Sequence, residues 1–182
     1  MSRNHHLRFW GILCLAATLE AGGFVLTSPD ISGQLTNDQV FAGFGCEGNN
    51  ISPELSWANA PAGTKSFAIT VYDPDAPTGS GWWHWVVFDI PADVHMLPRN
   101  AGNVESHLAP EGVIQSMTSF GQTGFGGACP PVEDGPHAYI ITVYALSVDH
   151  LGLDAQAPPE MVGFYLHTAT LAKASLIAYY DR

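Results

Sequence analysis

The sequence predicts a mainly β protein, an antiparallel sheet assembly with long loops and one helix near the C-terminus. Three segments are rich in the aromatic and β-branched residues that strands favour: Ser66 to Tyr72, Trp82 to Ile90 and Tyr139 to Leu146. Gly and Pro are concentrated between these segments, where they favour turns. Apolar residues recur at helical spacing after Pro158.

The N-terminus has the pattern of a secretory signal peptide. Arg3 and Arg8 precede an apolar run from Phe9 to Leu19, and the small residues at 21–23 follow it. We expect a signal peptide at 1–23, with an uncleaved anchor as the alternative. Export then implies a periplasmic or secreted location and no stable membrane association after cleavage.

A single domain at 24–182 is expected after the signal peptide. The chain has 182 residues and 46% of them are apolar, which suits one well-packed core and not two. Cys14 does not predict a lipid anchor, because the bulky Leu13 precedes it where a lipobox needs a small residue. The sequence shows no internal repeat or linker.

Each predicted element has its own pattern. In the first strand, apolar residues alternate, so Phe67, Ile69 and Val71 share one face. In the second strand, strict alternation places Trp83 and Trp85 on the face opposite His84. The helix opens at two prolines, and its apolar positions follow: Pro158, Pro159, Met161, Val162, Tyr165, Leu166, Ala169, Leu171 or Ala172. A last strand, Ala174 to Tyr180, completes the fold.

Only two cysteines lie outside the signal peptide, Cys46 and Cys129. In an exported protein a single pair indicates one disulfide, and two free buried thiols are the alternative. A metal-binding or catalytic role is less favoured, since the sequence has no CxxC pair and neither cysteine has a neighbouring His.

The charge distribution excludes some classes of partner. Beyond residue 23 the basic residues are few and dispersed: Lys65, Arg99, Lys173 and Arg182. Without a Lys or Arg cluster the chain has no surface for nucleic acid or for anionic lipid. An anion would therefore be held by backbone amides, histidines and hydroxyl groups in a small, specific site.

Three segments resemble the phosphatidylethanolamine-binding protein family, and most closely its exported bacterial Raf kinase inhibitor-like branch. They are NNISPELSW at 49–57, YDPDAPTGSGWWHWVVFDIP at 72–91 and FGGACPPVEDGPHAY at 125–139. The resemblance implies a β-fold of two antiparallel sheets with a few peripheral helices. It also implies a small pocket that accepts phosphate, acetate or a phosphorylated head group, and bacterial relatives suggest a homodimer.

The same resemblance gives the candidate ligand-binding residues: Asp73, Asp75, His84, His137 and Tyr139. Independently of it, Gly126 in the glycine-rich stretch is a candidate because glycine allows close approach of the backbone. Position 138 departs from the family pattern, because Ala138 stands where relatives often carry Arg or another polar residue. The methyl group of Ala138 cannot make the polar contact to a ligand or partner that such a side chain would make.

Physical chemistry assigns different roles to these side chains. Two carboxylates would repel an anion, so Asp73 and Asp75 are expected to accept hydrogen bonds from histidine or backbone amides and to orient those donors, or to contact an ammonium group. His84, His137 and Tyr139 would donate hydrogen bonds to the ligand.

The sequence therefore predicts an exported protein that binds a small anion or phosphoryl group, without a cofactor. A related role is regulation of a partner protein, in the manner of a kinase or protease inhibitor. The alternative is an acid-base or metal-assisted hydrolase that uses the same pocket, with Cys129 nearby. No catalytic residue or metal site is predicted, because Ser80 lies outside a nucleophile elbow and no HExxH is present.

Overall fold

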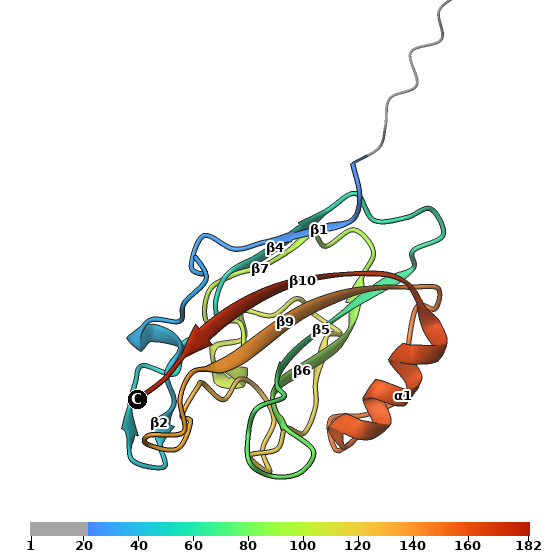
Figure 1. Cartoon of the computed structure of the whole chain (residues 1–182). Coiled ribbons are helices and arrows are strands. Elements are labelled where there is room, and N and C mark those ends of the chain that lie inside the picture. The colour runs from blue at the N-terminus through green and yellow to red at the C-terminus, as the bar shows by residue number, and fades with distance from the viewer. Residues whose placement is uncertain (1–21) are drawn as a thin grey trace, which may run out of the picture.

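A five-stranded antiparallel sheet forms the centre of the molecule (Figure 1). The computed structural model describes residues 22–182. The strand order in this sheet is β10-β9-β5-β6-β8. Its strands are β5 (Ser66–Asp73), β6 (Trp82–Pro91), β8 (Ile114–Gln115), β9 (His137–Leu146) and β10 (Thr170–Tyr180). The three strands predicted from composition are β5, β6 and β9, and each agrees with its prediction to within two residues.

Two smaller antiparallel sheets complete the β structure. One has the order β1-β4-β7, and the other is the hairpin of β2 and β3. Their strands are β1 (Val25–Thr27), β2 (Ala42–Gly43), β3 (Cys46–Glu47), β4 (Leu55–Ala58) and β7 (Met96–Leu97). Among residues 22–182 the helices are α1 (Pro159–Ala169) and two 3-10 turns, η1 (Asn37–Gln39) and η2 (Val104–Ser106). The predicted mainly β fold with a C-terminal helix is confirmed.

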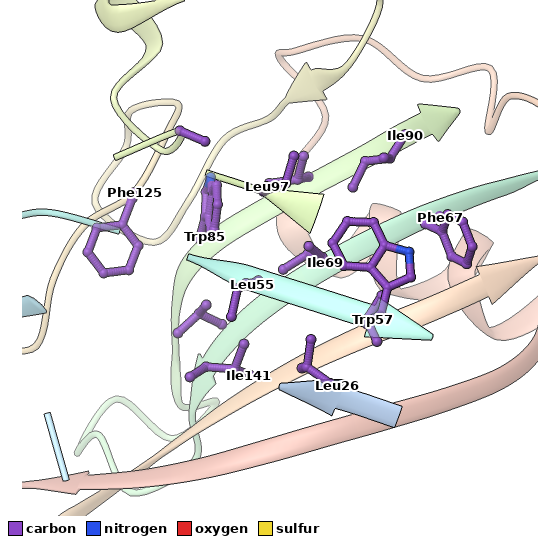
Figure 2. Close-up of a cluster of buried hydrophobic side chains, with 14 of the residues drawn as sticks. Leu26, Leu55, Trp57, Phe67, Ile69, Trp85, Ile90, Leu97, Phe125 and Ile141 are labelled. Atoms are coloured by element: carbon purple, nitrogen blue, oxygen red, sulfur yellow. The ribbon is translucent and has the colours of Figure 1, made fainter. Parts of the chain in front are cut away.

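Most of the core lies between the five-stranded sheet and the β1-β4-β7 sheet. Alternation in β5 turns Phe67, Ile69 and Val71 toward this layer, as predicted. Figure 2 shows Leu55 and Trp57 of β4 on the opposite side of the same cluster. These side chains are almost fully buried, so they supply the hydrophobic contribution that holds the two sheets together.

The other face of the central sheet is covered by α1 (Figure 1). Val162 and Leu166 of the helix pack with Val86 and Phe88 of β6 in a second buried cluster. The helix begins with Pro159, whose fixed φ and missing N–H suit the first helical turn. Strand β10 follows the helix directly, so the final strand begins at Thr170, four residues earlier than predicted.

A disulfide joins Cys46 of β3 to Cys129, as predicted. The two cysteines are 83 residues apart in sequence. The bond therefore ties the β2-β3 hairpin to the segment that leads into β9.

The predicted signal peptide lies outside the described residues, apart from Gly22 and Gly23. Within residues 22–182, no helix has the length and apolar character needed to cross a bilayer.

Candidate functional site

The candidate site lies at one end of the central sheet, where β5 ends and β6 and β9 begin (Figure 1). Antiparallel pairing brings these three strand ends together although they are distant in sequence. Asp73 pairs with Trp82 across β5 and β6, and Tyr72 pairs with Ile140 across β5 and β9. The candidate residues of the two distant motifs therefore meet at this edge.

A β-bulge in β6 directs His84 into the site. Val71 pairs with Trp85 and Tyr72 pairs with Trp83, so His84 is the extra residue with no partner in β5. A bulge breaks the alternation of side chains and turns neighbouring residues to the same face. The bulge explains why His84 points toward Tyr139, with ring centroids 5.1 Å apart.

The bulge also corrects the prediction for Trp85. Trp83 lies on the face opposite His84, as predicted, and packs with Tyr72 at a centroid distance of 4.4 Å. Trp85 instead lies in the main core beside Phe125, on the same side of the sheet as His84 (Figure 2). The assumption of strict alternation was wrong for Trp85. The bulge inserts one residue into β6, so the side chains that follow it point to the opposite face from the one that strict alternation predicts.

His84 is fixed by two hydrogen bonds to one residue, Gly126. Nδ1 of His84 lies 2.8 Å from the Gly126 carbonyl oxygen, and the Gly126 N–H donates to the His84 carbonyl oxygen at 2.8 Å. A Cβ at position 126 would overlap the Phe120 ring, so the position requires glycine. Gly126 therefore holds His84 in place and is not itself among the residues that line the cavity described below.

Burial lowers the pKa of His84 to about 4, and the hydrogen bond to Gly126 and the charge of Asp73 oppose this only in part. His84 is therefore neutral at pH 7. Its side chain is almost fully buried, and its Nε2 has no hydrogen-bond partner among the described residues.

The DPDAP segment forms a turn that positions the next strand. Oδ1 of Asp73 accepts the backbone N–H groups of Asp75 at 2.8 Å and Ala76 at 3.1 Å. Oδ2 of Asp75 accepts the Ala138 N–H at 2.8 Å. Both carboxylates thus accept hydrogen bonds from backbone amides, as expected. Asp75 is exposed and does not line the cavity. Its hydrogen bond to Ala138 instead connects the turn to β9.

His137 is held between two carboxylates. Its Nδ1 lies 2.8 Å from Asp73 Oδ2, and its Nε2 lies 3.2 Å from Asp134 Oδ2. Burial lowers the pKa of His137, but the hydrogen bonds and charges of Asp73 and Asp134 outweigh that effect and raise it above its ordinary value. His137 therefore favours the imidazolium form, in contrast to His84.

Tyr139 supplies a buried hydroxyl. Its side chain is 1% exposed, and the hydroxyl oxygen has no hydrogen-bond partner among residues 22–182. Burial, with a smaller contribution from nearby carboxylates, raises the pKa of the phenol, so the hydroxyl keeps its proton and can donate.

These residues line a cavity of about 220 Å³, which we call the site cavity. Asp73, His84, His137 and Tyr139 form its polar part, and the remainder is largely apolar: Phe44, Ala76, Pro77, Thr78, Trp82, Phe120, Cys129, Pro130 and Pro131. Cavities of this kind, apolar with a few converging polar groups, are typical binding sites for small molecules.

An aromatic wall forms one side of the site cavity, and sequence reasoning missed it. Phe120 packs edge-on against Trp82 at a centroid distance of 5.3 Å and against His84 at 5.4 Å. Phe44, at the tip of the β2-β3 hairpin, stacks on Phe120 with the two ring centroids 5.8 Å apart. Neither Phe44 nor Phe120 falls within a recognisable motif, so only the fold brings them to the cavity.

Asp134 was also missed. Its spacing three residues before His137 was the available signal, but a loop residue in a Gly and Pro-rich segment gives no reason to expect that contact. The Asp134 side chain is 43% exposed, so it lies at the outer edge of the site.

The site has few groups suited to covalent chemistry. Among the lining residues only Thr78 carries an aliphatic hydroxyl, and this donates to the Gly81 carbonyl oxygen at 2.6 Å. Across residues 22–182, no cluster of three or more His, Cys, Asp or Glu has the arrangement to hold a metal ion. Cys129, suggested as a metal ligand in the hydrolase alternative, is in the disulfide.

Comparison with known proteins identifies relatives across nearly the whole described region. The model of the phosphatidylethanolamine-binding protein family matches residues 31–181. The UPF0098 protein YbcL of Escherichia coli K12 is 49% identical over 164 residues, covering 89% of this chain and 90% of YbcL. YbhB of the same organism is 50% identical over 148 residues, covering 81% of this chain and 92% of YbhB.

A solved structure and a more distant relative extend this comparison. The crystal structure of Escherichia coli YbcL, described as a new member of the mammalian PEBP family, has a TM-score of 0.85 and covers 87% of this chain and 98% of that one. LppC of Mycobacterium tuberculosis, named as a lipoprotein, is 34% identical over 132 residues, covering 72% of this chain and 59% of LppC.

Proposed function

The chain belongs to the phosphatidylethanolamine-binding protein family, and from that premise we propose that it binds a small oxyanion or phosphorylated head group in the site cavity. One observation carries this proposal. His84 Nε2 and the Tyr139 hydroxyl are buried at the cavity without a hydrogen-bond partner among the described residues. Buried polar atoms are rarely left unpaired, because each costs about 1–3 kcal/mol, and a bound ligand would satisfy both.

His137 would supply the positive charge. Its Nε2 faces Asp134, whose carboxylate is partly exposed and comes from the loop before β9. A ligand oxygen would take the place of the Asp134 carboxylate and accept the Nε2 proton, while Asp73 continues to hold Nδ1. The ligand would thus replace one carboxylate with another anion at the same imidazolium, so no net charge is buried.

The proposal also covers the cellular location of the protein and its contact with a partner protein. The Cys46–Cys129 disulfide and the lipoprotein name of LppC support export to an oxidising compartment. Phe44 lines the cavity and is exposed, and the exposed Val132 directly follows the lining residue Pro131. Both would offer an apolar contact to a partner protein that this chain regulates in the manner of a kinase or protease inhibitor.

The binding proposal is tested by titrating the full chain with inorganic phosphate and phosphoethanolamine and following backbone NMR signals. We expect saturable shifts confined to residues 73–84 and 120–139. Replacing His84→Ala or His137→Ala should weaken binding by about tenfold or more, because each removes one hydrogen bond to the ligand. His167→Ala, on the exposed face of α1, is the matched control and should bind normally.

Asp134→Asn gives a test in the opposite direction. The variant removes the negative charge that competes with the ligand for His137, so phosphate affinity should rise by several-fold. Glu133→Gln is the control, because it removes the same charge from the adjacent, exposed residue, whose side chain makes no hydrogen bond or ion pair with any of residues 22–182. Unchanged affinity in both histidine variants and in Asp134→Asn would contradict the assignment of the site.

A further inference from the structure

The hydrogen bond at Nδ1 fixes which nitrogen of His84 carries the proton. Nδ1 lies 2.8 Å from the Gly126 carbonyl oxygen, and a carbonyl oxygen only accepts hydrogen bonds. Gly126 is itself held in place, because its N–H bonds back to His84 and the neighbouring Gly127 N–H donates to Asn50 Oδ1 at 2.7 Å. In the neutral imidazole, Nδ1 therefore carries the proton and Nε2 presents a lone pair.

The charged and titratable groups around His84 support this neutral form. From β5 the ring faces Asp73, from β9 it faces His137 and Tyr139, and from the segment before β9 it faces the backbone of Gly126 and Gly127. The Asp73 carboxylate favours charging of His84 and the His137 imidazolium opposes it. Burial exceeds both and lowers the pKa of His84 to about 4.

The site cavity therefore offers one acceptor beside one donor. His84 Nε2 accepts, and the Tyr139 hydroxyl, which keeps its proton, donates. The two rings are neighbours, with centroids 5.1 Å apart. An oxyanion without a proton would be bound by Tyr139 but would meet the lone pair of His84 with a second lone pair.

We propose that the site selects oxyanions that retain an acidic proton, such as hydrogen phosphate, a phosphonate or a phosphomonoester monoanion, over fully deprotonated oxyanions of the same shape, such as sulfate. The ligand P–OH donates to His84 Nε2, and an unprotonated ligand oxygen accepts from Tyr139. This inference rests on the proposed function, since it specifies which oxyanion occupies the same cavity.

Inorganic phosphate and inorganic sulfate are the matched probes, because both are tetrahedral and similar in size. Their affinities for the full chain at pH 7.0 are measured by calorimetry and NMR titration. Sulfate would need His84 to be protonated, but pH 7 lies about three units above the His84 pKa of about 4. Sulfate should therefore bind at least about 100-fold more weakly than phosphate.

The pH dependence gives a second readout on the same protein. Sulfate affinity should rise by up to about tenfold for each pH unit between 7 and 5, with one proton taken up per sulfate bound. Phosphate affinity should change by less than about tenfold over that range, because both of its ionic forms carry a proton.

Two variants separate the acceptor from the donor. His84→Gln places an amide near the Nε2 position, and an amide presents either its oxygen or its NH₂ to the cavity. The preference for phosphate at pH 7 should then fall to less than about tenfold. Tyr139→Phe removes a hydrogen bond common to both anions, so it should weaken both and leave their ratio at pH 5 unchanged.

The outcomes distinguish the inference from the proposal beneath it. If phosphate binds at pH 7 and sulfate does not, both the proposed anion site and the inferred selectivity are supported. Equal affinities for phosphate and sulfate in the wild-type protein at pH 7 would overturn the inference and leave the anion site standing. Failure of both anions, and of phosphoethanolamine, to bind would overturn the proposed function and the inference together.

Discussion

The surroundings of two histidines in one site shift their pKa values in opposite directions. His84 faces a carbonyl oxygen in a buried environment, which lowers its pKa to about 4. His137 is equally buried but faces Asp73 and Asp134, which raise its pKa. The sequence identified both residues as candidate donors but not this difference, because the sign of a pKa shift depends on the atoms that face the ring.

The buried His84 predicts a measurable loss of stability in acid. Its pKa in the folded state is below the unfolded value of 6.5, so between about pH 4 and 6.5 the unfolded chain binds more protons. Stability must therefore rise with pH across this window, by roughly 3 kcal/mol from this residue. His137 acts in the opposite sense, and its stabilisation is lost only as pH rises through its raised folded pKa.

Urea unfolding of wild type and His84→Gln between pH 4 and 6.5 checks this prediction. The variant should lose the His84 part of the pH slope, so the stability difference between the two proteins should narrow as pH falls. His167→Gln, an exposed histidine of α1, should keep the wild-type slope. Parallel curves for wild type and His84→Gln would show that His84 does not titrate in this window.

At the scale of elements, the strands were predictable and the bulge was not. Strands β5, β6 and β9 carry β-branched and aromatic residues between clear turn signals, so composition was enough to find them. The bulge at His84 depends on how β6 pairs with β5, and no local pattern records that pairing. It is also the feature that turns the histidine into the site.

The segment before β9 predicts a glycine requirement at position 126. Gly126→Ala would place a methyl group against the Phe120 ring, which forms the cavity wall. We expect destabilisation by about 1–3 kcal/mol, as for other overpacked positions, together with weaker phosphate binding.

Gly163→Ala in α1 is the matched control for this substitution. A Cβ there meets no atom within 4 Å, and alanine favours a helix over glycine, so this variant should gain about 0.5–1 kcal/mol. Chemical unfolding and phosphate titration of both variants provide the comparison. A stable, normally binding Gly126→Ala would show that Phe120 can move without cost to the site.

At the scale of the whole molecule, the fold arranges three layers that cover the two faces of the central sheet but not the end at which the site lies. The β1-β4-β7 sheet covers one face of the central sheet and α1 covers the other (Figure 1). The site cavity lies beyond these layers, closed by the β2-β3 hairpin and by the segment that carries Cys129. The disulfide joins these two parts of the wall.

Removing the disulfide should therefore affect both stability and binding. In the chain-entropy model, a bond between residues 83 positions apart contributes at most roughly 4 to 5 kcal/mol. The double variant Cys46→Ser/Cys129→Ser should unfold at lower denaturant and bind phosphate more weakly, because Phe44 and Pro130 are no longer tied together. Reductant should shift wild type in the same direction and leave the double variant unchanged.

A thiol titration of the exported, unfolded and unreduced protein completes this test. It should detect no free thiol at positions 46 and 129. Two free thiols, or equal stability of wild type and double variant, would contradict both the bond and the export on which it depends.

The sequence by itself determined the mainly β class, the positions of the long strands, the C-terminal helix, the cysteine pair and the family. These follow from local composition, from cysteine count and from motifs that are contiguous in the chain. Tertiary structure alone decided that Phe44 and Phe120 line the cavity, that Asp134 contacts His137, and that Asp75 does not line the cavity. It also decided that the pKa of His84 is lowered while that of His137 is raised. The physical reason is that wall contacts and pKa values depend on burial and on atoms that pairing brings together from distant parts of the chain.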